Sequence, residues 1–291
     1  MARDPVQLLA QADKAYSSAD SGFSWFGSRT EKYENAAELY ISAGGAYRLQ
    51  QAGQEAGMAY EKAANIQGTK LSEPDDMANT LQDAFKAYRK TCPEDAARCL
   101  SQAIDHYMQK SNFRRAATQK QILAEFYEEI GAKLKARSVY AEAAQLYEDD
   151  RAYALANKLN IKAAELAAME SDYLDATRRF EHVARQSMSS NLMKFSVTKY
   201  LLQAGTCHLA MDVIGAKRAL ESYRELDHEF SSTGEYRFLA SLSEMVEQGD
   251  PDAFGGQVDR FFELKTRPEP WLRNIYEKIK NQLKEREEDF S

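Results

Sequence analysis

The feature that most constrains the fold is a short residue pattern that recurs at a fixed interval. In Ala136-Arg-Ser-Val-Tyr140-Ala-Glu-Ala143 a small residue is followed four positions later by a large apolar residue, and three positions after that by another small one. On an α-helix these three positions share one face. Similar patterns begin at residues 96, 136, 176 and 216, so the interval is 40 residues. Two earlier copies begin at Ala36 and Ala56.

An interval of this length is typical of a helical solenoid. Forty residues accommodate two helices of about fifteen residues and two short turns. The small residues let neighbouring helices approach, and the large one fills the space above them. The pattern resembles the second helix of a tetratricopeptide repeat, lengthened beyond the usual roughly 34 residues. We therefore predict an all-α, right-handed tetratricopeptide-like solenoid, in which antiparallel helix pairs form a twisted sheet.

The composition supports a helical intracellular protein. The 291 residues include only 6 Pro and 14 Gly, and the net charge of −7 argues against general nucleic-acid binding. The 3 cysteines form no C-x-x-C pair, which favours a reducing compartment over a disulfide framework or a zinc site. The amino-terminal residues contain no apolar run, and no stretch reaches the roughly 18 apolar residues of a membrane span. We expect a cytoplasmic protein.

The repeating pattern ends after Phe230, which predicts two domains. Residues 1–230 would form the solenoid, and residues 231–291 a C-terminal helical bundle with an exposed acidic tail. Units that depart from the consensus usually cap a repeat array. In the last predicted helix, apolar residues at steps of four form one face: Trp271, Ile275, Ile279 and Leu283.

Residues 20–29 form a polar loop that carries three large aromatic side chains, Phe23, Trp25 and Phe26. Gly and Ser interrupt the helical pattern on both sides. Two interpretations remain open from the residues alone. The rings pack back onto the first repeat, or they form an apolar contact with a membrane or a partner.

Basic residues recur at one place within the repeat. Lys158 and Lys162 are four residues apart, so they face the same way on a helix. Lys120 and Lys199 occupy neighbouring repeat positions, and Arg114 and Arg115 begin the equivalent helix one unit earlier. A basic stripe on an acidic protein predicts an acidic partner surface. An ordinary solvated face with salt bridges is the alternative.

No motif for catalysis or for cofactor binding occurs. The chain has neither a G-x-x-x-x-G-K-[ST] phosphate loop nor a G-x-G-x-x-G motif after a strand, and its 4 histidines lack metal-ligand spacing. We predict that the protein is not an enzyme and needs no cofactor or metal.

Five segments together carry a resemblance to a known family. They are Asp4-Pro-Val-Gln-Leu-Leu, the loop Ser-Gly-Phe-x-x-Phe, Ala36-Ala-Glu-Leu-Tyr40, Asn157-Lys-Leu-Asn-Ile-Lys162 and the ending Glu-Glu-Asp-Phe. Their order and spacing resemble a soluble NSF attachment protein of the alpha type, from Asp4 to the last residue. The resemblance implies a non-catalytic adaptor that binds the SNARE four-helix bundle and recruits and stimulates NSF, a hexameric AAA+ ATPase that disassembles it. It also implies a monomer in solution, with several copies around one bundle, peripherally associated with membranes.

The resemblance assigns three sites. The SNARE-binding surface would comprise Lys158 and Lys162, and less specifically Arg114, Arg115, Lys120, Arg89, Lys90 and Lys199. The membrane-attachment loop would comprise Phe23, Trp25 and Phe26, and the NSF-activating end Glu287, Glu288, Asp289 and Phe290.

Two positions depart from the family pattern. Some members carry Lys where this chain has Thr118, and many carry Leu where it has Phe290. Lys120 lies about 200° around the helix from Thr118 and is a poor substitute for that lysine. The alternative function is a generic tetratricopeptide-like scaffold that docks peptide segments, without an ATPase partner.

Overall fold

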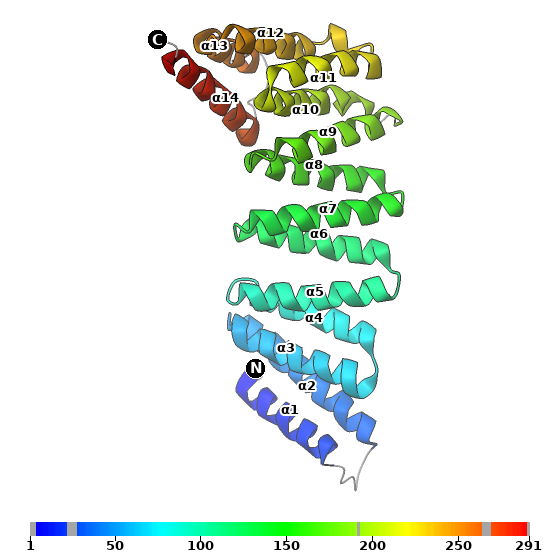
Figure 1. The fold of residues 1–291 in the computed structure, drawn as a ribbon. Coiled ribbons are helices and arrows are strands. Elements are labelled where there is room, and N and C mark those ends of the chain that lie inside the picture. Colours follow the sequence, from blue (N-terminus) through cyan, green and yellow to red (C-terminus); the bar gives the residue numbers. More distant parts are fainter. Residues whose placement is uncertain (1–3, 22–27, 191–192, 264–268, 290–291) are drawn as a thin grey trace. The chain divides into compact units, whose positions relative to one another are not determined.

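The computed structural model describes residues 4–21, 28–190, 193–263 and 269–289. The chain divides into two compact units, Met1–Ala132 and Lys133–Ser291. All regular elements in these described ranges are helical, which confirms the all-α prediction (Figure 1). Within the same ranges, no helix combines the length and the apolar character needed to cross a bilayer.

In the first unit, consecutive helices run antiparallel and each packs on the next (Figure 1). The elements are α1 Pro5–Asp20, α2 Arg29–Leu49, α3 Gly53–Ile66, a π-helical turn Gln67–Leu71, α4 Pro74–Tyr88, α5 Pro93–Gln109 and α6 Phe113–Glu129. A capping box begins α2, because Ser28 Oγ accepts the Glu31 N–H at 3.1 Å and the Glu31 carboxylate accepts the Ser28 N–H at 2.8 Å.

In the second unit the same antiparallel packing continues, and the last helix folds back onto earlier ones. The elements are α7 Lys133–Asp149, α8 Tyr153–Met169, α9 Tyr173–Met188, α10 Val197–Met211, α11 Val213–Leu226, α12 Gly234–Gln248, α13 Pro251–Glu263 and α14 Pro270–Asp289, with short 3-10 turns at Lys194–Ser196 and Phe230–Ser232. The helix α14 packs against α8, α10 and α13.

The recurring pattern forms the core of both units, as predicted. Ala136 and Ala143 are fully buried and Tyr140 is 2% exposed. The corresponding residues of the other five copies are buried as well. The face of Trp271, Ile275, Ile279 and Leu283 is also buried, in a core that α14 shares with α8 to α13. The division into a solenoid of residues 1–230 and a bundle of residues 231–291 stays a prediction.

The turns between helices repeat every 20 residues from residue 111 to residue 171. One residue in each turn has a left-handed backbone: Ser111 (φ 56°), Gly131 (φ 77°), Arg151 (φ 58°) and Ser171 (φ 64°). The residue that follows donates its N–H back to a helix carbonyl, as Asn112 does to Tyr107 at 2.8 Å. This is a Schellman motif, which satisfies carbonyls at a helix end.

Between α3 and α4 the helical segment continues past Gly68. A π-helical turn carries the chain to Leu71. The turn ends at Ser72, which has a left-handed backbone, and the Glu73 N–H then closes on the Gln67 carbonyl at 2.8 Å. The Thr69 hydroxyl bonds to the Asn65 carbonyl at 2.7 Å, and this contact extends the helical segment.

Candidate interaction surfaces

The strongest candidate residue, Lys158, lies on the solvent side of α8. Ala156, Leu159, Asn160 and Ala163 form the buried side of this helix. That spacing leaves Lys158 exposed and Lys162, one turn later, half-buried. Among the described residues, Lys158 makes no hydrogen bond or ion pair. Its ammonium group is therefore available to an external anion.

Lys199, on α10 of the same unit, is exposed but paired. Its Nζ lies 2.6 Å from Glu269 Oε1, immediately before α14. Close by in sequence, the side chain of Phe195 is 92% exposed. This ring is not among the residues predicted from the sequence, although a large aromatic residue between Lys194 and Ser196 is a visible signal.

In the first unit, α6 carries three of the predicted basic residues. Arg115 is bound within its own unit, because its Nη2 donates to Asn79 Oδ1 at 2.7 Å and its guanidinium lies 4.4 Å from the centre of the Tyr107 ring. Arg114 and Thr118 are exposed, whereas Lys120 is half-buried. Lys120 and Thr118 thus differ in environment, as their angular separation predicts.

Arg89 and Lys90 follow α4 and are both exposed. Arg89 is held at the end of α6, since its Nε donates to Glu129 Oε2 at 2.9 Å. Lys90 makes no such contact with the described part of the chain. The structure thus separates the predicted basic residues into paired ones (Arg89, Arg115 and Lys199) and unpaired ones (Lys90 and Lys158).

The three predicted membrane-attachment residues, Phe23, Trp25 and Phe26, lie outside the described residues. The helix ends on either side of residues 22–27 contact one another. Tyr33 of α2 donates to Asp20 Oδ1 at 3.0 Å, and Lys70 lies 3.3 Å from the same oxygen. Arg29 Nε donates to the Ala19 carbonyl at 3.1 Å. These contacts hold the end of α1 against the beginning of α2.

The predicted NSF-activating end continues α14. The helix runs to Asp289, and the side chains of Glu285, Arg286 and Glu287 are exposed beyond the buried Leu283. The side chains of Glu288, Asp289 and Phe290 lie outside the described part.

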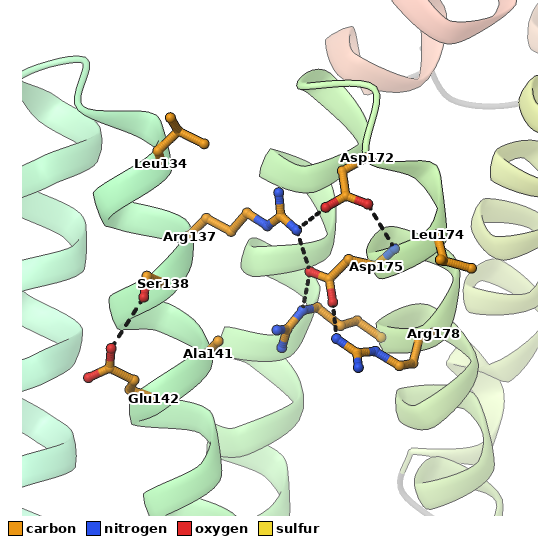
Figure 2. Close-up of a pocket in the computed structure, with 10 residues that line it drawn as sticks. Leu134, Arg137, Ser138, Ala141, Glu142, Asp172, Leu174, Asp175 and Arg178 are labelled. Carbon is orange, nitrogen blue, oxygen red and sulfur yellow. Dashed lines mark hydrogen bonds and ion pairs between the residues drawn. The ribbon is translucent and has the colours of Figure 1, made fainter.

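A groove of about 780 Å³ lies between α7 and α9 and is lined by a cluster of charged side chains. Figure 2 shows Arg137 of α7 reaching toward Asp172, the N-cap residue of α9, and toward Asp175 within α9. Asp175 Oδ2 accepts from Arg137 and from Arg179, each at 2.9 Å, and its other oxygen accepts from Arg178. Burial opposes ionisation of Asp175, but the hydrogen bonds from Arg179 and Arg178 outweigh it and lower the pKa to about 2.

The Arg and Asp side chains in this groove are paired with one another. The Asp175 carboxylate already occupies the position that a ligand anion would take between the guanidinium groups. Groups of three or more His, Cys, Asp or Glu that could hold a metal ion do not occur in the described ranges. Ion pairs of Arg137 with Asp172 and Asp175 join α7 to the beginning of α9.

Comparison with known proteins identifies the family. Residues 3–284 match the soluble NSF attachment protein family (SNAP). The chain is 42% identical to a probable vesicular-fusion protein sec17 homolog of Neurospora crassa and 42% identical to that of Schizosaccharomyces pombe, each over the whole of both chains. It is 31% identical to the human alpha-soluble NSF attachment protein, over 99% of this chain and 97% of that one. The chain is a member of the soluble NSF attachment protein family.

Proposed function

We propose that Lys158 and Lys162 form the centre of the surface through which this chain binds an assembled SNARE four-helix bundle. The observation that supports this most directly is the exposure of Lys158 on α8 without a partner among the described residues. Ammonium groups available to solvent attract an acidic partner and orient it during binding. The paired residues Arg89, Arg115 and Lys199 contribute less, since each already contacts its own unit.

Membership of the family indicates the cellular role of the chain. The chain is an NSF adaptor in vesicular fusion and SNARE complex disassembly, and it is not an enzyme. It interacts with NSF and with SNAREs. We propose further that it is a cytoplasmic monomer, that several copies surround one bundle, and that the adaptor associates peripherally with membranes through Phe23, Trp25 and Phe26.

The NSF contact is proposed for the end of α14, at Glu287, Glu288, Asp289 and Phe290. The buried face of this helix ends at Leu283, and the exposed Glu285, Arg286 and Glu287 follow. A short acidic segment with one terminal aromatic residue suits a basic partner surface that has a small apolar pocket.

The test of the basic surface is a double charge reversal. Lys158→Glu with Lys162→Glu should weaken binding to an assembled SNARE bundle more than tenfold, because attraction to the acidic surface becomes repulsion. Binding by the unaltered protein should also weaken as salt is added. Binding is measured by titration with a labelled soluble bundle.

A matched control places the same charge change elsewhere in the unit. Arg218 and Arg224 are exposed on α11, so Arg218→Glu with Arg224→Glu should leave binding nearly unchanged. Both double variants should retain the helical circular dichroism of the parent. Equal binding by the α8 variant and the parent at low salt would remove Lys158 and Lys162 from the site.

A further inference from the structure

Glu269, immediately before α14, joins three side chains from two helices. Its Oε1 accepts from Lys199 Nζ at 2.6 Å, and its Oε2 accepts from Gln203 Nε2 at 2.9 Å and from Trp271 Nε1 at 3.0 Å. Lys199 and Gln203 are four residues apart on α10, so one face of α10 is tied to the first turn of α14. The Glu269 carbonyl also accepts the Leu272 N–H at 3.0 Å.

Two of the three donors that bond to Glu269 are buried. Gln203 is 1% exposed and Trp271 is 7% exposed. The Trp271 ring stacks on Phe180 of the repeating pattern, with ring centres 5.5 Å apart and planes at 13°. Without the carboxylate, a buried amide and a buried indole N–H would both lose their acceptor, which is costly.

The rest of α14 is held independently of Glu269. Thr206 and Tyr276 share a hydrogen bond of 2.8 Å, and Lys278 Nζ donates to Ser171 Oγ at 3.1 Å. The buried side of the helix also packs in the common core. The influence of Glu269 should therefore be confined to the first turns of α14.

We propose that Glu269 is the positioning residue of the C-terminal helix and that it couples this helix to the basic surface through Lys199. The Lys199 side chain is 55% exposed, so its ammonium is accessible to a second carboxylate from a partner. An acidic partner that engages Lys199 competes with Glu269 and loosens the beginning of α14. This coupling rests on the proposed SNARE-binding function, whereas the positioning role does not.

The positioning role is tested without any partner, by hydrogen exchange of the purified full chain. In Glu269→Ala the amides of residues 271–276 should exchange about fivefold faster than in the parent, the effect of losing roughly one net hydrogen bond. Glu269→Gln retains one carbonyl acceptor and should fall between the two. Exchange in α7 should stay unchanged, which excludes global unfolding.

The matched control is Glu247→Gln. It removes the charge from another ion pair, Glu247–Lys217, that joins α12 to α11 and does not touch α14. This variant should exchange like the parent at residues 271–276. Parental exchange in Glu269→Ala would overturn the positioning role.

The coupling is tested by adding a soluble SNARE bundle at saturating concentration. Exchange at residues 271–276 should rise in the parent and stay constant in Lys199→Met, which lacks the ammonium. A bundle that binds the parent without changing this exchange would overturn the coupling. A bundle that does not bind the parent would contradict the proposed function, while the result for Glu269→Ala would still decide the positioning role.

Discussion

The Asp175 carboxylate accepts hydrogen bonds from three arginines on two helices. Arg137 and Arg179 have side chains that are only 19% exposed, whereas that of Arg178 is 74% exposed. Removing the charge of Asp175 would leave two largely buried guanidinium groups without their shared anion. Removing Arg178 would remove only the solvent-exposed ion pair of the cluster. The three arginines therefore differ in their expected contributions to stability.

We predict that Asp175→Asn lowers the free energy of unfolding by about 3 kcal/mol, as expected when one partner of a buried ion pair is lost. Arg178→Ala should cost less than about 1 kcal/mol, because exposed pairs contribute little. Urea denaturation followed by circular dichroism measures both values. If the two variants lowered the free energy of unfolding equally, burial would not distinguish the ion pairs of the cluster.

The pH dependence of the same variant gives an independent check. The folded pKa of Asp175, about 2, lies below its ordinary value of 3.8. Its ionised form is thus favoured in the folded state, so its stabilisation is present above about pH 4 and is lost as the pH falls toward 2. The parent should lose this stability on acidification, and Asp175→Asn should lack that component.

At the scale of the element, α2 contains two adjacent glycines, and only one of them is needed for close packing against α3. A Cβ on Gly44 would lie 3.0 Å from atoms of the Tyr60 ring, which belongs to the repeating pattern of α3. A Cβ on Gly45 would meet only the Tyr60 hydroxyl, at 3.8 Å. Close approach of α2 to α3 therefore requires glycine at one position and not at the other.

We predict that Gly45→Ala stabilises the protein by about 0.5–1 kcal/mol, because alanine favours the helix over glycine. Gly44→Ala should instead destabilise it by about 1 kcal/mol or more, since overpacking against a buried ring outweighs that gain. Thermal unfolding of the two single variants makes the comparison. A stabilising Gly44→Ala would show that the Tyr60 ring moves aside freely.

The core of each helix could be predicted from the sequence, whereas the turns and the long-range ion pairs could not. The spacing of Ala136, Tyr140 and Ala143 identified the core and the fold, because burial imposes a helical period on the residues. The left-handed turns at Ser111, Arg151 and Ser171 carry no glycine, so their geometry left no signal. Helix periodicity likewise placed Lys158 in solvent but could not show that Lys199 pairs with Glu269, 70 residues later in the chain.

At the scale of the whole molecule, the aromatic loop should matter only when a membrane is present. Burying part of three rings at a bilayer surface yields a few kcal/mol at about 25 cal/mol per Å², comparable to one weak anchor. Several adaptors on one bundle would combine such anchors through avidity. We therefore predict that changing Phe23, Trp25 and Phe26 to Ser slows NSF-driven disassembly of membrane-anchored SNARE complexes and hardly affects soluble ones.

The two substrates provide the control for this variant. Disassembly is followed by loss of fluorescence transfer between labelled SNARE subunits, in liposomes and in solution. An equal loss on both would indicate that the rings pack within the protein, and a lower thermal midpoint would support that interpretation.

The end of α14 should act on NSF without affecting SNARE binding. Residues 285–289 include four acids and Arg286, so their net charge is −3. The buried face of the helix ends before them, at Leu283. Removing residues 287–291, or changing Phe290 to Ala, should therefore leave thermal stability and SNARE binding nearly unchanged. Both changes should lower the ATPase rate that the adaptor stimulates in NSF, because each removes the terminal ring from the contact and the truncation removes acidic residues as well.

The decisive measurement is ATP turnover by NSF at saturating adaptor and saturating SNARE bundle, since saturation removes any difference in assembly. Phe290→Leu separates the two components of the contact. If an apolar pocket receives residue 290, leucine should preserve stimulation where alanine lowers it, whereas a purely electrostatic contact would make both variants behave like the parent. A truncated adaptor that stimulates turnover as well as the intact chain would show that the tail has no part in activation.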